Sequence, residues 1–114
     1  MKMLTIRKAG ESIATVWHAS GYFSRLRGLL GRALKPDGGL MLTPCSCIHT
    51  IGMGYAIDAI YLDRAYQILR VDHAIAPGKV CKGQHGARHV LELPEGAAEL
   101  RNLSPGDILE VSHG

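Results

Sequence analysis

Short runs of apolar residues, separated by turn residues, predict a series of β-strands along this chain. In residues 12–18, Ile13, Thr15 and Trp17 alternate with Ser12, Ala14 and Val16, and the β-branched and aromatic side chains favour a strand. Residues 56–62 form an almost continuous apolar run, which is typical of a buried strand. The same criteria predict further strands over 2–7, 39–43, 67–73, 87–93 and 108–111, and an extended segment over 45–50.

One segment follows a helical period, with apolar residues at i, i+4, i+7 and i+8: Tyr22, Leu26, Leu29 and Leu30. The pattern predicts an N-terminal helix over residues 21–31, with Ser20 as its N-cap. Pro94 can occupy the first helical position of a second, short helix over 95–101. Many short strands, glycine-rich turns and few helices favour a mainly β fold, a compact sandwich or barrel.

Composition adds limits to this picture. The chain has 114 residues, of which 46% are hydrophobic and 14 are glycine, so a single domain over 1–114 is expected. The formal net charge is +3, and no dense run of lysine and arginine favours a nucleic-acid partner. Without an apolar stretch of signal-peptide or membrane-helix length, the sequence favours a cytoplasmic protein with no membrane partner.

Six stretches, taken in order, resemble the prokaryotic family catalogued as domain of unknown function 192: Arg25–Arg32, Gly38–Leu42, Ile48–Met53, Ile57–Asp63, Val90–Gly96 and Ser104–Asp107. The resemblance covers roughly residues 14–111. It implies a compact, mainly β, jelly-roll-like domain with a helix near the N-terminus, and it implies no reaction. Many members carry Phe-Trp-Met-Lys-Asn-Thr where this chain is similar to an Ile-His-Thr-x-x-Met branch, so no role of that lysine carries over.

Three residues spaced by two, Cys45, Cys47 and His49, are candidate metal ligands. On a strand they would point to one face, and Cys81 and His85 from a later loop could complete a zinc site. The Cys-x-Cys spacing is unlike the usual zinc knuckle, and the alternative is that the thiols are small apolar side chains on a sheet face.

The same residues also permit a metal- or cysteine-dependent hydrolase. Cys45 or Cys47 would be the nucleophile, His49 the base and Asp58 the group that orients it. Positions i and i+4 of a strand are about 13 Å apart, so this arrangement requires the chain to bend.

Asp58 is unusual because it lies inside an apolar run, between Ile57 and Ala59. A buried carboxylate needs partners, such as Arg25, Arg88 or backbone N–H groups, and an ion pair or loop-fixing role would supply them.

Alternatively, a pocket for a small polar or anionic ligand would be lined by four residues: Arg25, His49, Thr50 and Asp58. The sequence therefore predicts a binding or accessory module, with a ligand or a protein as its partner. A hydrolase and a structural subunit of a larger assembly are the alternatives.

Overall fold

Seven strands make up one sheet in the computed structural model, which describes residues 2–20 and 39–113. The strand order is β5-β4-β6-β3-β2-β1-β7, and every neighbouring pair is antiparallel except β2 with β3. The strands are β1 (Lys2–Lys8), β2 (Glu11–Ser20), β3 (Gly39–Thr43), β4 (Ile57–Leu62), β5 (Ile68–Ile75), β6 (His89–Pro94) and β7 (Glu110–His113).

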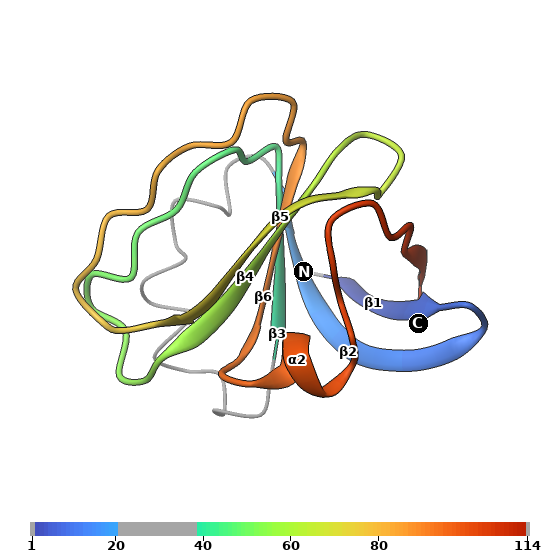
Figure 1. Cartoon of the computed structure of the whole chain (residues 1–114), viewed down its shortest axis with the longest axis horizontal. Coiled ribbons are helices and arrows are strands. Elements are labelled where there is room, and N and C mark those ends of the chain that lie inside the picture. The colour runs from blue at the N-terminus through green and yellow to red at the C-terminus, as the bar shows by residue number, and fades with distance from the viewer. Residues whose placement is uncertain (1, 21–38, 114) are drawn as a thin grey trace.

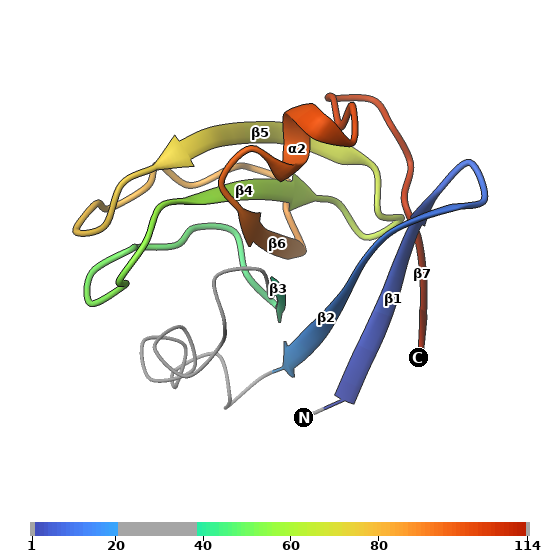
Figure 2. The ribbon, with the colours of Figure 1, turned by 90° about the horizontal axis from the view of Figure 1, so that it is seen from below.

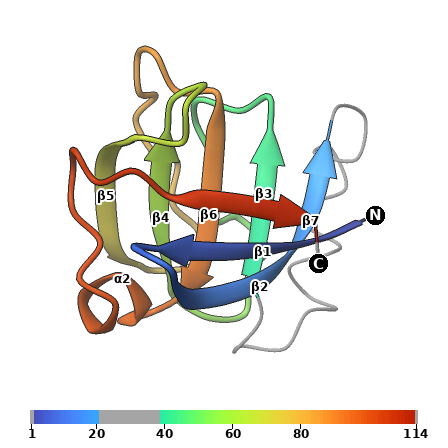
Figure 3. The ribbon, with the colours of Figure 1, turned by 90° about the vertical axis from the view of Figure 1, so that its right-hand side faces the viewer.

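The sheet is strongly curled, so that β1, β7 and the first half of β2 cross over one face of the other four strands (Figures 2 and 3). Near one end, residues 66–68 bond to residues 106–109: Ile68 N–H donates to Asp107 O at 2.8 Å, and Leu109 N–H to Tyr66 O at 3.0 Å. The mainly β prediction is confirmed, but the barrel is not closed, because β5 and β7 end the strand order of the described residues.

Two clusters of buried residues lie on opposite faces of this sheet. The first fills the space inside the curl, and its members include Leu4, Ile6, Val16, Met41, Ile60, Leu62, Leu91 and Leu109. The second lies on the outer face and includes Leu40, Leu42, Ile48, Met53, Ile57, Tyr61 and Val90. Residues of the loops that follow β3 and β5 belong to this second cluster, so these loops cover part of the outer face. Figure 1 shows both loops extending away from the ends of the strands.

Close packing explains the glycine at the start of β3. A Cβ added at Gly39 would lie 2.6 Å from Cγ1 of Val16 and 3.0 Å from the Glu92 carbonyl oxygen. These distances are too short for a side chain, so glycine lets β3 enter the sheet between β2 and β6.

Helix α2 (Ala97–Leu100) is shorter than the helix predicted over 95–101. Gly96 precedes it with φ of +88°, a conformation that favours glycine, and Ala98 is buried in the inner cluster. The helix predicted over 21–31 lies outside the described residues. No helix in the described ranges has the length and apolarity needed to cross a membrane.

Candidate functional site

Asp58 is completely buried near the start of β4. Its Oδ1 accepts a hydrogen bond from Ala74 N–H at 2.8 Å, and its Oδ2 accepts one from Ala98 N–H at 3.0 Å. The carboxylate thus ties β4 to the end of β5 and to α2. Because it has no accessible surface, a soluble ligand does not reach it in this conformation.

Thr50 is also completely buried and bonded to backbone. Its hydroxyl donates to Ala76 O at 2.6 Å and accepts from Lys79 N–H at 2.8 Å. Its own N–H donates to Lys79 O at 2.7 Å. Thr50 and Asp58 therefore both hold the segment 74–79, and neither presents a free polar atom to a cleft.

His49 lies on the surface and forms an isolated bridge with Val80. The side chains of its buried neighbour Thr50 and of the buried Asp58 are hydrogen-bonded to backbone groups. These three residues therefore do not converge on an open polar pocket. The fourth residue of the predicted pocket, Arg25, lies outside the described residues.

The extended segment predicted over 45–50 is not one of the strands of the sheet. It runs beside 79–88 through backbone bonds, among them Cys81 N–H to Ile48 O at 2.9 Å and Gln84 N–H to Ser46 O at 2.8 Å. Pro44 precedes this segment and has no N–H to offer a sheet.

The cysteines in this segment differ in environment: Cys45 is half-buried against the outer cluster, and Cys47 is exposed. Cys45 Sγ donates to Cys47 O at 3.1 Å. Within residues 2–20 and 39–113, no three histidine, cysteine, aspartate or glutamate side chains are grouped to share a metal ion. Zinc binding by Cys45, Cys47 and His49 is therefore not supported by their placement and stays a prediction.

A buried histidine escaped the sequence analysis. His89 begins β6, its Nδ1 lies 2.6 Å from the Thr43 hydroxyl, and its ring stacks on Tyr66 with centroids 4.6 Å apart. Burial, with smaller effects from Arg88 and His18, lowers the pKa of His89 to about 4. The imidazole is therefore neutral near pH 7. No sequence spacing relates His89 to another candidate site residue, so the sequence did not indicate it.

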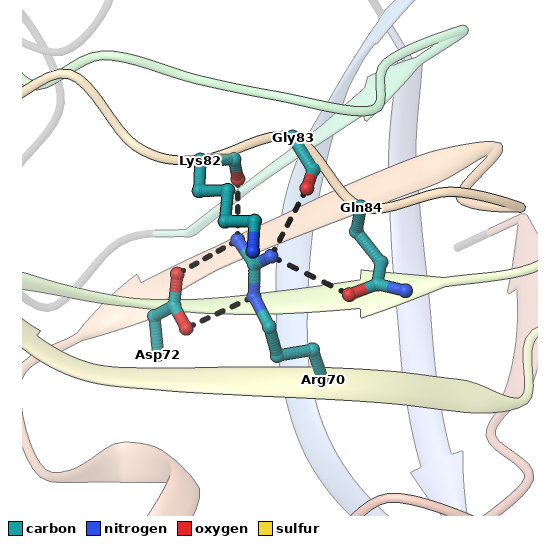
Figure 4. A network of polar contacts seen from close by, with 5 residues as sticks. All are labelled: Arg70, Asp72, Lys82, Gly83 and Gln84. Carbon is teal, nitrogen blue, oxygen red and sulfur yellow. Dashed lines mark hydrogen bonds and ion pairs between the residues drawn. The ribbon is translucent and has the colours of Figure 1, made fainter.

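Arg70 on β5 is the centre of a polar network (Figure 4). Its guanidinium bonds Asp72 through Nε and Nη2, at 3.1 and 3.0 Å. It also donates to three groups of the neighbouring loop: the carbonyls of Lys82 and Gly83 and the side chain of Gln84. Its Cζ lies 4.0 Å from the Tyr61 ring centroid. Its donors are therefore committed to the protein, which gives Arg70 a structural role.

The described surface has a groove of about 620 Å³ between β2, the end of β6 and α2. A second hollow of about 200 Å³ adjoins it and shares Ile13, Leu100 and Arg101. The larger groove is lined by Ile13, Ala14, Thr15, Gly39, Leu93, Pro94, Glu95, Gly96, Ala97, Leu100 and Arg101.

Two lining residues decide what kind of ligand this groove could bind. Leu100 is 75% exposed although it is a large apolar side chain. The Arg101 side chain is exposed, and it forms no ion pair or hydrogen bond within the described residues. The groove combines an apolar wall with one available cation, and the sequence analysis singled out none of its residues as a site.

A family model matches residues 4–111, nearly the whole chain. The chain belongs to domain of unknown function 192, a family described as "Uncharacterized ACR". The resemblance expected from six ordered stretches is therefore confirmed, and the match begins further toward the N-terminus than those stretches do. No curated protein matches this sequence.

Two solved structures share the fold of this DUF192 chain. One, from Sinorhizobium meliloti, is described as a "putative transcription regulator"; it is 22% identical, with a TM-score of 0.78 over 96% of this chain and 92% of its own. The other is a protein of unknown function from Novosphingobium aromaticivorans, 17% identical, with a TM-score of 0.74 over 95% and 83%. At these identities the similarity establishes the fold of the DUF192 chain and not its activity.

Proposed function

We propose that this chain is a binding module whose site is the groove between β2 and α2. The groove volume carries the proposal, because about 620 Å³ falls within the roughly 300–1,000 Å³ typical of ligand sites. The sequence favoured the same class of function but located the pocket near His49 and Asp58. Asp58 and Thr50 are fully occupied by backbone partners, whereas the groove has polar and apolar surface that no described residue covers.

The lining indicates the chemistry of the ligand. Ile13 and Leu100 offer apolar contact, and Arg101 offers a guanidinium that a carboxylate or sulfonate can engage through two N–H groups. We therefore expect an amphipathic ligand with an apolar body and an anionic group. A cytoplasmic location stays a prediction from the sequence.

Anilinonaphthalene sulfonate (ANS), an apolar dye with one anionic group, tests this assignment. We expect ANS to bind with saturation and to shift the backbone NMR signals of residues 13–15, 93–97 and 100–101. Leu100→Ser and Arg101→Glu should each weaken its binding by about tenfold, because each removes one half of the amphipathic match.

Val80→Ser is the matched control for Leu100→Ser. Val80 is 78% exposed, as Leu100 is 75% exposed, but Val80 lies in the loop beside His49 and does not line the groove. ANS affinity should be unchanged in this variant. Equal losses in Val80→Ser and Leu100→Ser, or shifts confined to residues outside the groove, would overturn the assignment.

A further inference from the structure

Two cysteines of the segment that follows β3 lie close together, with only Ser46 between them. Cys45 Sγ donates a hydrogen bond to the backbone oxygen of Cys47 at 3.1 Å, so its sulfur is in contact with that residue. The chain bends at Ser46, which brings the two Cα atoms closer than the roughly 6.6 Å of two extended residues. Disulfide-linked residues have Cα atoms about 4.4–6.8 Å apart, so this backbone permits a bond between Cys45 and Cys47.

The two thiols differ in their access to solvent. Cys47 is exposed, whereas Cys45 is half-buried and packs against the outer cluster. A reagent that arrives from solvent therefore meets Cys47 first, and the sulfur of Cys45 is close enough to complete a second step. An accessible thiol next to a second cysteine is the arrangement that thiol oxidation to a disulfide requires.

We propose that Cys45 and Cys47 are a redox-active pair that a hydroperoxide oxidises to a disulfide. The groove lining includes neither cysteine, so this site does not depend on the proposed function. In the first step, the thiolate of Cys47 attacks one oxygen of the peroxide. An S–O bond forms and the O–O bond breaks, which leaves Cys47 as a sulfenic acid. The second oxygen leaves as water or an alcohol, with the proton that Cys47 gave up.

The second step closes the disulfide. Cys45 Sγ attacks the sulfenic sulfur of Cys47, so that an S–S bond forms and the S–O bond breaks. The hydroxide that leaves takes up the thiol proton of Cys45 and becomes water. The two thiols together lose two electrons, and the hydroperoxide gains them. Two molecules of glutathione reverse the reaction by thiol–disulfide exchange, since a disulfide across a single residue closes a small, strained ring that is readily reduced.

Oxidation also changes how the neighbouring loop is held. Gln84 N–H donates to Ser46 O at 2.8 Å, so the residue between the two cysteines fastens the loop that precedes β6. A disulfide requires Cβ atoms about 3.8 Å apart, and the peptide groups on both sides of Ser46 turn to meet that distance. The Ser46 oxygen then no longer faces Gln84, and the disulfide form holds this part of the loop less firmly.

Trypsin separates the cysteines in a way that maps the disulfide directly. Cys45 and Cys47 share one peptide, which ends at Arg64, whereas Cys81 lies in the peptide 80–82. After treatment with hydrogen peroxide, we expect the first peptide to have lost two hydrogen atoms and the second to be unchanged. The number of thiols that react with dithionitrobenzoate in denaturant should fall from three per chain to one, and glutathione should restore all three.

Single substitutions separate the roles of the cysteines. Cys45→Ser should leave Cys47 as a sulfenic acid that dimedone traps, because the thiol that displaces the hydroxide is gone. Cys47→Ser should form no disulfide and should consume peroxide about tenfold more slowly or less. Because Cys47 is exposed, this variant tests the pair without disturbing the outer cluster. Cys81→Ser is the control, and it should form the same disulfide as the unaltered chain.

Amide hydrogen exchange in the reduced and oxidised protein tests the effect on the loop. Exchange at Gln84 should be about tenfold faster in the disulfide form. Thr50 N–H, which bonds Lys79 O beyond the bend, should exchange equally in both forms. Equal rates at Gln84 would show that the disulfide does not control the loop, and that part of the proposal would be wrong.

Two results would overturn the redox pair itself. A disulfide that joins the peptide 80–82 to the larger peptide would show that Cys81 is a partner in place of Cys45 or Cys47. Peroxide that leaves three thiols intact, or that carries Cys47 to a sulfonic acid with no disulfide in between, would show that Cys45 does not complete the second step.

Discussion

Asp58 shows how one side chain can join three parts of a fold. Its two carboxylate oxygens each accept a backbone N–H, one from Ala74 and one from Ala98, inside a region without water access. A buried donor that loses its acceptor retains the cost of its desolvation. The residue is therefore essential to the architecture, and its unusual position within an apolar strand follows from that role.

Asp58→Asn should lower the free energy of unfolding by about 2–3 kcal/mol, because its amide NH₂ would face one of the two N–H donors. Urea denaturation followed by circular dichroism measures the change. Glu99→Gln, an exposed change of the same chemical kind on α2, should alter stability by less than about 0.5 kcal/mol. Similar stabilities for the two variants would contradict the role assigned to Asp58.

His89 makes stability depend on pH. Its pKa is near 6.5 when unfolded and about 4 when folded, because burial disfavours the charged ring. As the pH falls, the His89 imidazole of the unfolded chain therefore binds a proton before that of the folded chain does. Above about pH 6.5 both are neutral, so His89 does not reduce the free energy of unfolding there. The free energy of unfolding declines as the pH falls from 6.5 to 4, by about 3 kcal/mol in total.

Urea denaturation at intervals between pH 4 and 7.5 measures this decline. His89→Phe keeps a ring against Tyr66 but cannot titrate, so it should flatten the slope. His85→Gln changes an exposed histidine and should leave the slope as it is. Burial also lowers the pKa of His18, so a smaller slope should remain in His89→Phe. An undiminished slope in that variant would show that His89 is not the source.

At the scale of elements, Arg70 fastens the loop between β5 and β6 to the sheet. Its five donor contacts reach Asp72 and residues 82–84 (Figure 4), and Gln84 N–H in turn bonds Ser46 O. The loop therefore has few independent motions while the guanidinium is in place. Lysine cannot reproduce this arrangement, because it lacks the planar fork.

Arg70→Lys should loosen the loop while leaving the sheet intact. Amide exchange at Gln84 should accelerate by about tenfold or more, and iodoacetamide should alkylate the half-buried Cys81 faster. Exchange in β6 should not change. Arg64→Lys, at an exposed position, is the control. If exchange at Gln84 is the same in both variants, Arg70 does not hold the loop.

The strands themselves could be predicted from the sequence because each carries its own local pattern. The run over 56–62 and the turn residues between runs located β4 and its neighbours to within about two residues. The partner of the extended segment 45–50 could not be predicted. It pairs with the irregular segment 79–88, and local alternation does not show which partner a chain will find.

At the scale of the whole molecule, the candidate site could not be predicted because it is assembled from distant segments. Ile13–Thr15 and Leu93–Arg101 meet only because β3 lies between β2 and β6 in the strand order. The structural role of Asp58 could be predicted from the sequence, because a carboxylate in an apolar run requires hydrogen-bond donors. Backbone N–H groups were among the candidate donors. Which donors it meets depends on the positions of β5 and α2.

The pairing of β1 with β7 has a consequence for how the chain acquires its fold during synthesis. Leu4 lies opposite His113 and Arg7 opposite Glu110, so two strands about 100 residues apart in the sequence are neighbours in the sheet. Such contacts have a high entropic cost of closure and form late. On the ribosome, β1 and β2 can pair early, but the outer edge of β1 stays open to foreign strands until residue 113 has emerged.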